Sequence, residues 1–274
     1  MKKAVIFAAA VLAAVLVCAG ACAEDVPKSW PVLYLFAHQD DELGAVAKIA
    51  TDVRAGRNVF VVWVTDGAGT AAKDVREKES RAAMALIGVP DGNLFFLGYP
   101  DRYSVKHIEE AYKQVLDIVN ANGVAEITTD AYEGGSVDHD VTSLIGAYVS
   151  KNSKPRPAHY EIPLYNMYKN VYRLGKFLPF PGAETLSTPV DAGMADLKVK
   201  VLEMYPSQAA IVNTMKAMSS RKELMKNGEL YRVSPAYDYM KRPSDETLNY
   251  ETNTRNPITF KDWQDAVSAF TKKY

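Results

Sequence analysis

The hydrophobic and polar positions of residues 31–150 follow two alternating periodicities. Short runs of consecutive apolar residues are typical of buried strands, and longer stretches with apolar residues three and four positions apart are typical of helices. These patterns predict strands over residues 32–37, 58–64, 93–97 and 125–129, and helices over residues 43–55, 74–87 and 105–121. Strands that alternate with such helices imply right-handed crossovers and a mainly parallel sheet. We therefore expect an α/β protein with a Rossmann-like open sheet and helices on both faces.

The alternation stops after residue 150. Five prolines between residues 155 and 181 interrupt a tyrosine-rich segment, and helical spacing returns only over residues 191–204 and 208–218. The chain from Ser219 onward is polar and broken by prolines. No internal repeat or low-complexity linker divides the chain. We therefore predict one domain over residues 24–274, with a core at about residues 31–210 and a C-terminal elaboration packed on the sheet.

The first 23 residues have the pattern of a signal peptide. Lys2 and Lys3 precede an uncharged apolar stretch, and Ala21-Cys22-Ala23 forms an A-x-A-like cleavage site. We predict that residues 1–23 are removed, which leaves an exported protein, periplasmic or secreted, without a transmembrane span. A retained membrane anchor, or lipoprotein anchoring through an acylated Cys22, is the alternative. Because Cys18 and Cys22 are the only cysteines, a metal site in the cleaved chain must use His, Asp and Glu.

The amino-acid composition indicates which kinds of molecule this protein could bind. The 32 basic and 33 acidic residues give a formal net charge of −1, so the chain lacks the electrostatic footprint of a nucleic-acid-binding protein. Apolar residues make up 48% of the chain, which is enough for a sizeable core. We therefore expect a small-molecule or glycan partner and no nucleic acid.

A charged motif, AHQDDE at residues 37–42, follows the first predicted strand. In an open α/β sheet, ligands bind where strands end and helices begin. His38 and Asp41 are three residues apart at a helix start, so both side chains can face one metal ion. Asp40, between them, is then free for proton chemistry.

A second motif, GGSVDHD at residues 134–140, follows the fourth strand and precedes a predicted helix over residues 141–149. The carboxyl ends of parallel strands open on one edge of the sheet, so the two motifs can face each other. His38, Asp41 and His139 would then form a two-His, one-carboxylate site with an open position, a ligand set that suits catalytic zinc, although iron, cobalt or nickel also bind such sites. A metal held there lowers the pKa of water towards about 7 and polarises a carbonyl oxygen. Asp40 would take the proton of the attacking water and later deliver it to the leaving amine.

These motifs resemble those of the LmbE / PIG-L deacetylases, zinc hydrolases that remove the acetyl group from N-acetylglucosamine units. The first motif of that family is AHPDDE, and its second motif is HPDH, often within GGHPDHD. Further likenesses are TDG at residues 65–67, LGYPD at residues 97–101 and YPSQ at residues 205–208. The resemblance covers roughly residues 31–210.

The resemblance implies a role for each matching residue. It assigns Asp40 as the general base, and it assigns the zinc ligands to His38, Asp41 and His139. Arg76 and Asp101 align with positions that hold sugar hydroxyls. We interpret Glu42 as a charge at a helix N-terminus, stabilised by the macrodipole, rather than as a catalyst.

Two departures from the family pattern bear on activity. Gln39 replaces a proline, which we expect to change only backbone rigidity. Ser136 replaces a histidine that steadies the oxyanion in relatives, and its shorter, neutral hydroxyl is a weaker oxyanion contact. Losing one oxyanion donor commonly lowers the rate by about 10²–10³-fold. Tyr132 and His159 are alternative candidates for that donor.

The sequence therefore predicts an exported, zinc-dependent N-deacetylase acting on a substrate that contains N-acetylglucosamine. Ser136 motivates an alternative, a catalytically impaired metal- and sugar-binding protein on the same scaffold. Hydrolysis of a non-sugar amide is a third option, because the metal chemistry does not require a sugar.

Overall fold

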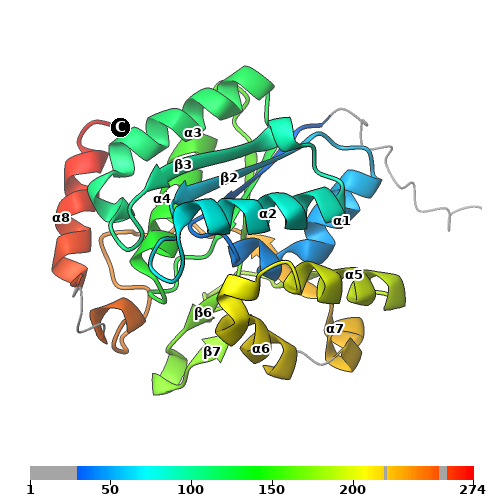
Figure 1. The fold of residues 1–274 in the computed structure, drawn as a ribbon. Helices are drawn as coiled ribbons and strands as arrows, with labels where there is room; N and C mark the ends of the chain where they lie inside the picture. Colours follow the sequence, from blue (N-terminus) through cyan, green and yellow to red (C-terminus); the bar gives the residue numbers. More distant parts are fainter. Residues whose placement is uncertain (1–29, 219–220, 253–257) are drawn as a thin grey trace, which may run out of the picture.

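The computed structural model describes residues 30–218, 221–252 and 258–274 (Figure 1). The predicted signal peptide, with both cysteines, lies outside these described residues. Within them, none of the helices has the length and apolar character needed to cross a membrane.

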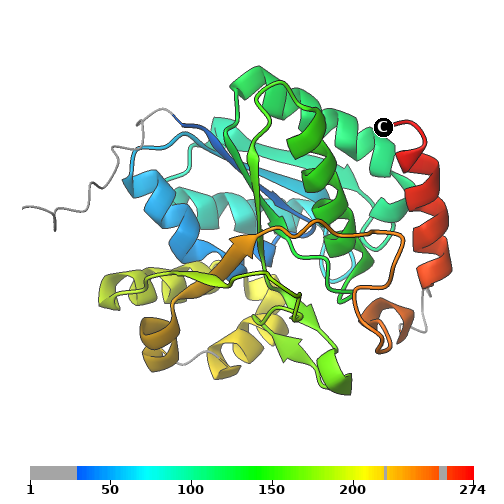
Figure 2. The same ribbon diagram turned by 180° about the vertical axis from the view of Figure 1, so that it is seen from behind.

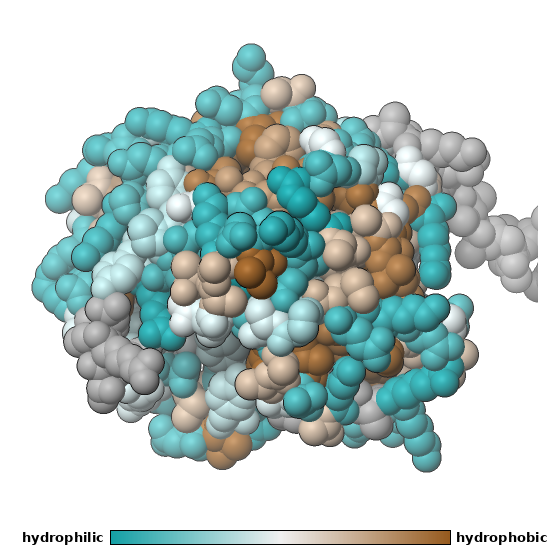
Figure 3. All heavy atoms as spheres, in the orientation of Figure 1, coloured by the Kyte–Doolittle hydropathy of each residue, from teal (hydrophilic) through white to brown (hydrophobic). Residues whose placement is uncertain are grey.

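Seen from one side, the surface is mostly hydrophilic, and hydrophobic residues form separate patches near the middle of that face (Figure 3).

A seven-stranded sheet has the strand order β3-β2-β1-β4-β5-β9-β8. Its strands are β1 (Val32–Phe36), β2 (Val59–Thr65), β3 (Leu94–Tyr99), β4 (Glu126–Asp130), β5 (Ala158–Ile162), β8 (Leu186–Thr188) and β9 (Glu229–Val233). The first five strands in this order pair in parallel, and β9 and β8 add an antiparallel edge. The prediction of an open, mainly parallel Rossmann-like sheet is confirmed.

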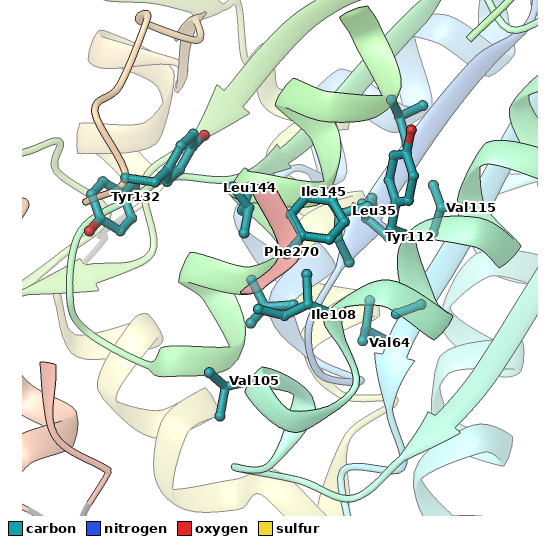
Figure 4. Close-up of a cluster of buried hydrophobic side chains, with 14 of the residues drawn as sticks. Leu35, Val64, Val105, Ile108, Tyr112, Val115, Tyr132, Leu144, Ile145 and Phe270 are labelled. Atoms are coloured by element: carbon teal, nitrogen blue, oxygen red, sulfur yellow. The ribbon is translucent and has the colours of Figure 1, made fainter. Parts of the chain in front are cut away.

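Helices cover both faces of the sheet (Figures 1 and 2). One face carries α1 (Val46–Arg54), α2 (Lys73–Ile87) and α5 (Ala192–Leu202), and the other carries α3 (Ile108–Asn122), α4 (Val137–Asn152) and α8 (Phe260–Thr271). Alternate residues of β1 enter the two cores: Tyr34 and Phe36 face the first group of helices, and Leu33 and Leu35 face the second. Figure 4 shows Leu35 among side chains of the second core. Burial on both faces explains why β1 is apolar throughout.

The C-terminal part contains more regular structure than the sequence predicts. The fifth parallel strand, β5, is not predicted, because Ala158 is exposed, the next two residues are half-buried, and the strand contains no apolar run. Helix α8 lies in the stretch expected to be polar and broken, and Trp263 is fully buried. A capping box of Thr259 and Asp262 marks the start of α8, and this was the signal available in the sequence.

A short hairpin, β6 (Tyr165–Asn166) and β7 (Arg173–Leu174), forms a second, two-stranded sheet. It lies beside α6 (Ala209–Met218), below the main sheet in Figure 1, and α7 (Arg221–Asn227) follows α6. Together these elements form much of the elaboration that the sequence predicts after residue 150.

Candidate active site

The two charged motifs meet at the carboxyl edge of the sheet. His38 and Asp41 follow β1, and His139 lies in the first turn of α4. His38 Nδ1 lies 3.1 Å from Asp41 Oδ2 and 3.2 Å from His139 Nε2, and His139 Nε2 lies 3.2 Å from Asp41 Oδ1. One ligand atom from each residue lies within 4.8 Å of the others. The structure thus brings together the three residues that the sequence analysis names as metal ligands.

The other nitrogen of His38 faces two further carboxylates. His38 Nε2 lies 3.1 Å from Asp138 Oδ2 and 3.4 Å from Asp101 Oδ1. Asp138 is fully buried, and it accepts hydrogen bonds from the backbone N–H groups of Ser104 (3.1 Å) and Arg102 (2.6 Å). A carboxylate fixed in this way can hold the imidazole of a metal ligand in one orientation. Asp138 was not predicted to be a site residue, although its place directly before His139 was a signal in the sequence.

The donor chemistry of the first cluster fits a divalent metal. Two imidazoles and one carboxylate are the donors of catalytic zinc sites. Burial opposes ionisation of Asp41, but His139 and His38 lower its pKa overall, so the carboxylate is charged. Burial likewise opposes protonation of His38, but Asp41, Asp101 and Asp138 raise its pKa overall. The surroundings therefore favour positive charge at this point, as a cation site requires.

Asp40 lies beside this cluster in an unusual backbone conformation. Its φ of 140° is in a region that non-glycine residues rarely adopt, at a cost of about 1–3 kcal/mol. Its Oδ1 lies 3.1 Å from Arg76 Nη2. Burial raises the pKa of the Asp40 carboxyl to about 7, although Arg76 acts in the opposite direction. Strain and a shifted pKa are both typical of functional carboxyls.

Glu42 supports this strained loop from inside the protein. Its carboxylate is fully buried and accepts hydrogen bonds from Asp40 N–H (2.8 Å), Trp63 Nε1–H (3.1 Å) and the Tyr205 hydroxyl. The interpretation of Glu42 as a charge held by the helix macrodipole misses these contacts, because the side chain turns into the core. Gln39 also does more than alter backbone rigidity, since its Nε2 donates to the Thr65 carbonyl (2.9 Å) at the end of β2.

Arg76 and Asp101 both line the cleft beside the cluster. Arg76 is buried, with 2% of its surface exposed. Its guanidinium donates to Thr70 Oγ1 (3.1 Å) and to the Gln39 carbonyl, and it also pairs with Asp40. Its hydrogen bonds are thus directed at the loop, which favours a role in positioning Asp40. Asp101 Oδ2 accepts a hydrogen bond from the Gly69 N–H (2.9 Å). Burial raises the pKa of the Asp101 carboxyl, but the contact with His38 helps to lower this pKa overall, to about 2. Their contact with sugar hydroxyls stays a prediction.

Ser136 is the N-cap of α4, and its Oγ accepts from Asp138 N–H (3.2 Å) while lining the cleft. The alternative oxyanion donors lie elsewhere. Tyr132 lies in the second core (Figure 4). Its ring packs against Trp263, and its hydroxyl donates to the Lys241 carbonyl (2.8 Å). His159 on β5 lies 2.9 Å from Thr129 Oγ1. Neither residue lines the cleft, so the structure does not support either as the donor.

The cleft has a volume of about 370 Å³. This lies at the lower end of the range of about 300–1,000 Å³ for small-molecule sites. The lining combines acidic and basic residues with Tyr165, Tyr172 and Leu174 of the hairpin and with Ile211 and Met215 of α6. A larger hollow of about 720 Å³, between α3 and α8, contains none of the candidate site residues.

Tyr165 also lines the cleft, and its phenol can donate a hydrogen bond to a ligand. It is not among the site residues predicted from the sequence. Its ring centroid lies 5.1 Å from that of His139, with the planes at 73°. Burial raises the pKa of the Tyr165 phenol. The only signal in the sequence was its place in the tyrosine-rich segment.

Gly135 permits the close approach of the hairpin to the loop before α4. A Cβ atom at this position would lie 2.0 Å from the Tyr165 carbonyl oxygen.

Gly135→Ala is therefore expected to lower the free energy of unfolding by about 1–3 kcal/mol, because backbone atoms must move to relieve the overlap. Urea denaturation measures this loss. In Gly92→Ala, the added Cβ meets nothing within 4 Å, so the stability of that control is expected to change little. Equal stability of the two variants would contradict the close contact.

The fold and the cluster of His38, Asp41 and His139 define a class of protein. It is an α/β protein with a candidate metal site at the carboxyl ends of parallel strands. Residues 33–149 match the family model PIG-L, described as GlcNAc-PI de-N-acetylase. This match over residues 33–149 confirms the predicted resemblance to the PIG-L (LmbE-like) family. No curated protein matches the chain in sequence.

Several solved structures share the fold. A deacetylase of the teicoplanin biosynthesis pathway is 17% identical with a TM-score of 0.59, over 74% of this chain and 96% of that one. N,N′-diacetylchitobiose deacetylase from Pyrococcus horikoshii is 18% identical with a TM-score of 0.53, over 75% and 84% of the two chains. The 4-carboxy-2-hydroxymuconate hydratase GalB from Pseudomonas putida KT2440 is 11% identical with a TM-score of 0.53, over 80% and 99%. Because a hydratase shares the fold, the fold by itself does not decide the reaction.

Proposed function

We propose that this protein is an exported, metal-dependent hydrolase that removes an acetyl group from a substrate containing N-acetylglucosamine. The observation that carries the proposal is the convergence of His38, Asp41 and His139 beside Asp40 in one cleft. The match of residues 33–149 to the PIG-L family supports the same reaction.

His38, Asp41 and His139 are the residues that would hold the metal, with zinc as the ion that best suits this donor set. When bound, such an ion supplies Lewis-acid polarisation of the acetamido carbonyl and lowers the pKa of a water molecule. Asp138, on the far side of the His38 imidazole, keeps that ring in the orientation the site requires.

Asp40 acts as the general base in this proposal. Its carboxylate lines the cleft next to the cluster and takes one proton from the water that attacks the carbonyl carbon. It then delivers this proton to the nitrogen as the C–N bond breaks, so that the products are a free amine and acetic acid, which ionises to acetate. Arg76 holds the carboxylate from its other side, which limits its freedom between the two transfers.

The shape of the cleft favours a sugar-sized substrate. Its volume of about 370 Å³ suits a small ligand, and its lining contains both charged and aromatic residues. Asp101 and Arg76 offer polar contacts to hydroxyl groups, and Tyr165 and Tyr172 of the hairpin offer aromatic faces. The deacetylase of Pyrococcus horikoshii is named for an acetamido sugar, which supports the same substrate class here.

The proposal of export depends on the leader over residues 1–23 alone. An exported deacetylase would meet glycans of the cell envelope or of the surroundings. Anchoring through Cys22 would keep the same cleft at a membrane surface.

The proposal is tested with purified protein, added zinc and N-acetylglucosamine conjugates, with detection of free amine. We expect amine release that stops when a chelator removes the metal and returns when zinc is restored. No release from any conjugate by zinc-loaded protein would overturn the enzymatic function. Equal release from simple acetamides would show that the substrate need not be a sugar.

A further inference from the structure

The candidates predicted from the sequence do not supply a strong hydrogen-bond donor for the oxygen that becomes negative during amide hydrolysis. The hydroxyl of Ser136 is short and caps α4, and Tyr132 and His159 do not line the cleft. The Arg76 guanidinium is directed at Asp40 and its loop. A reaction through a tetrahedral intermediate gains much of its rate from such a donor.

Tyr165 meets the requirements for this donor. It lines the cleft together with Ser136 and His139, and its ring lies edge-on to His139. Its hydroxyl makes no hydrogen bond to any residue in the described ranges 30–218, 221–252 and 258–274, so its proton is available to a ligand. A phenol has an ordinary pKa of about 10, so it is an O–H donor at neutral pH.

The surrounding residues hold Tyr165 in place from both sides. The buried Glu133 carboxylate accepts hydrogen bonds from the Leu164 N–H (3.3 Å) and from Asn166 Nδ2–H (3.1 Å), the two sequence neighbours of Tyr165. The missing side chain of Gly135 lets the Tyr165 backbone pack against the loop that carries Ser136. A donor fixed in advance stabilises developing charge without a cost for reorganisation.

We propose that the Tyr165 hydroxyl donates the hydrogen bond that stabilises the oxyanion, in the role that a histidine at position 136 would otherwise fill. This inference depends on the proposed deacetylase function. As water adds to the carbonyl carbon, the π electrons move to the oxygen, and Tyr165 donates its hydrogen bond while keeping its proton. When the C=O bond re-forms, the C–N bond breaks and the amine leaves with the proton carried by Asp40.

The first test is Tyr165→Phe, which removes only the hydroxyl and keeps the ring against His139. We expect kcat to fall by about 10²–10³-fold with KM changed by less than about threefold, because the contact forms in the transition state. The metal content should not change. Tyr168→Phe is the matched control, because Tyr168 follows β6 in the same hairpin and does not line the cleft; its kcat should stay at the wild-type value.

A binding measurement gives a second readout that needs no turnover. A methylphosphonamidate analogue of the acetamido sugar mimics the tetrahedral oxyanion, and Tyr165→Phe is expected to bind it about 10²-fold more weakly. Affinity for the deacetylated sugar should be unchanged. Adding Ser136→His to Tyr165→Phe should restore part of the lost kcat, because it supplies a donor from the neighbouring loop.

Wild-type kcat and wild-type analogue affinity in Tyr165→Phe would overturn the inference. A rise in KM with an equal loss of affinity for the deacetylated sugar would overturn it as well, since Tyr165 would then only bind the sugar ring. If the wild-type protein neither releases amine nor binds the analogue, the deacetylase proposal itself fails, and this inference fails with it.

Discussion

Replacing Asp40 with asparagine is expected to lower kcat by about 10²–10⁴-fold, the range usual for the loss of a general acid–base group. The amide has nearly the same shape as the carboxylate but cannot accept the proton of the attacking water. The metal ligands are not altered, so elemental analysis should give the same metal content as in the wild-type protein. Steady-state release of free amine, measured on zinc-loaded protein, gives the change in kcat.

The control for this prediction is Asp74→Asn, at an exposed position near the start of α2. The same chemical change there should leave kcat within about twofold of wild type, since surface substitutions away from the site have small effects. Arg76 keeps its hydrogen bonds to Thr70 and Gln39 in Asp40→Asn, so the variant should fold. Full activity of Asp40→Asn would show that another group handles the proton.

His139→Ala is expected to abolish metal binding and amine release together. The substitution removes one of two imidazoles in the cluster, and the remaining His38 and Asp41 would offer only two protein ligands, fewer than the three typical of catalytic zinc. Because Lewis-acid stabilisation is worth several kcal/mol, the rate should fall by at least about 10³-fold. Elemental analysis of the purified variant, together with the amine assay, measures both effects.

His107→Ala serves as the matched control, because His107 stacks on Tyr99 at the start of α3 and is not part of the cluster. That variant should keep both its metal and its activity. If His139→Ala kept a full complement of metal, the cluster at the sheet edge would not be the metal site. If it lost the metal but kept its rate, the reaction would not depend on that ion.

Long-range polar contacts shape the candidate site as much as the two motifs do. Glu42 joins the Asp40 loop to Trp63 on β2 and to Tyr205, 163 positions along the chain. Glu133 joins the second motif to Leu164 and to Leu178. Each carboxylate is buried and accepts several hydrogen bonds, so removing one is expected to disturb the loops that carry the chemistry.

The sequence by itself determined the first four strands, the helices between them and the positions of the two charged motifs. These features depend on local patterns: β1 is apolar because both of its faces are buried, and the spacing of His38 and Asp41 lets both side chains face one point. The open, mainly parallel sheet follows from the alternation of such elements, and the edge at which the motifs meet follows from the parallel strands.

Only the tertiary structure decided which other side chains reach the cleft. Tyr132 and His159 do not line it, whereas Tyr165 does, with β6 packed against Gly135. Asp138 meets His38 across 100 positions of sequence. Such contacts depend on how distant segments pack and on the direction in which each side chain leaves its strand or helix. Local patterns of apolar and polar residues do not encode these long-range distances, so a single sequence predicted the cluster of candidate ligands but not the residues that surround it.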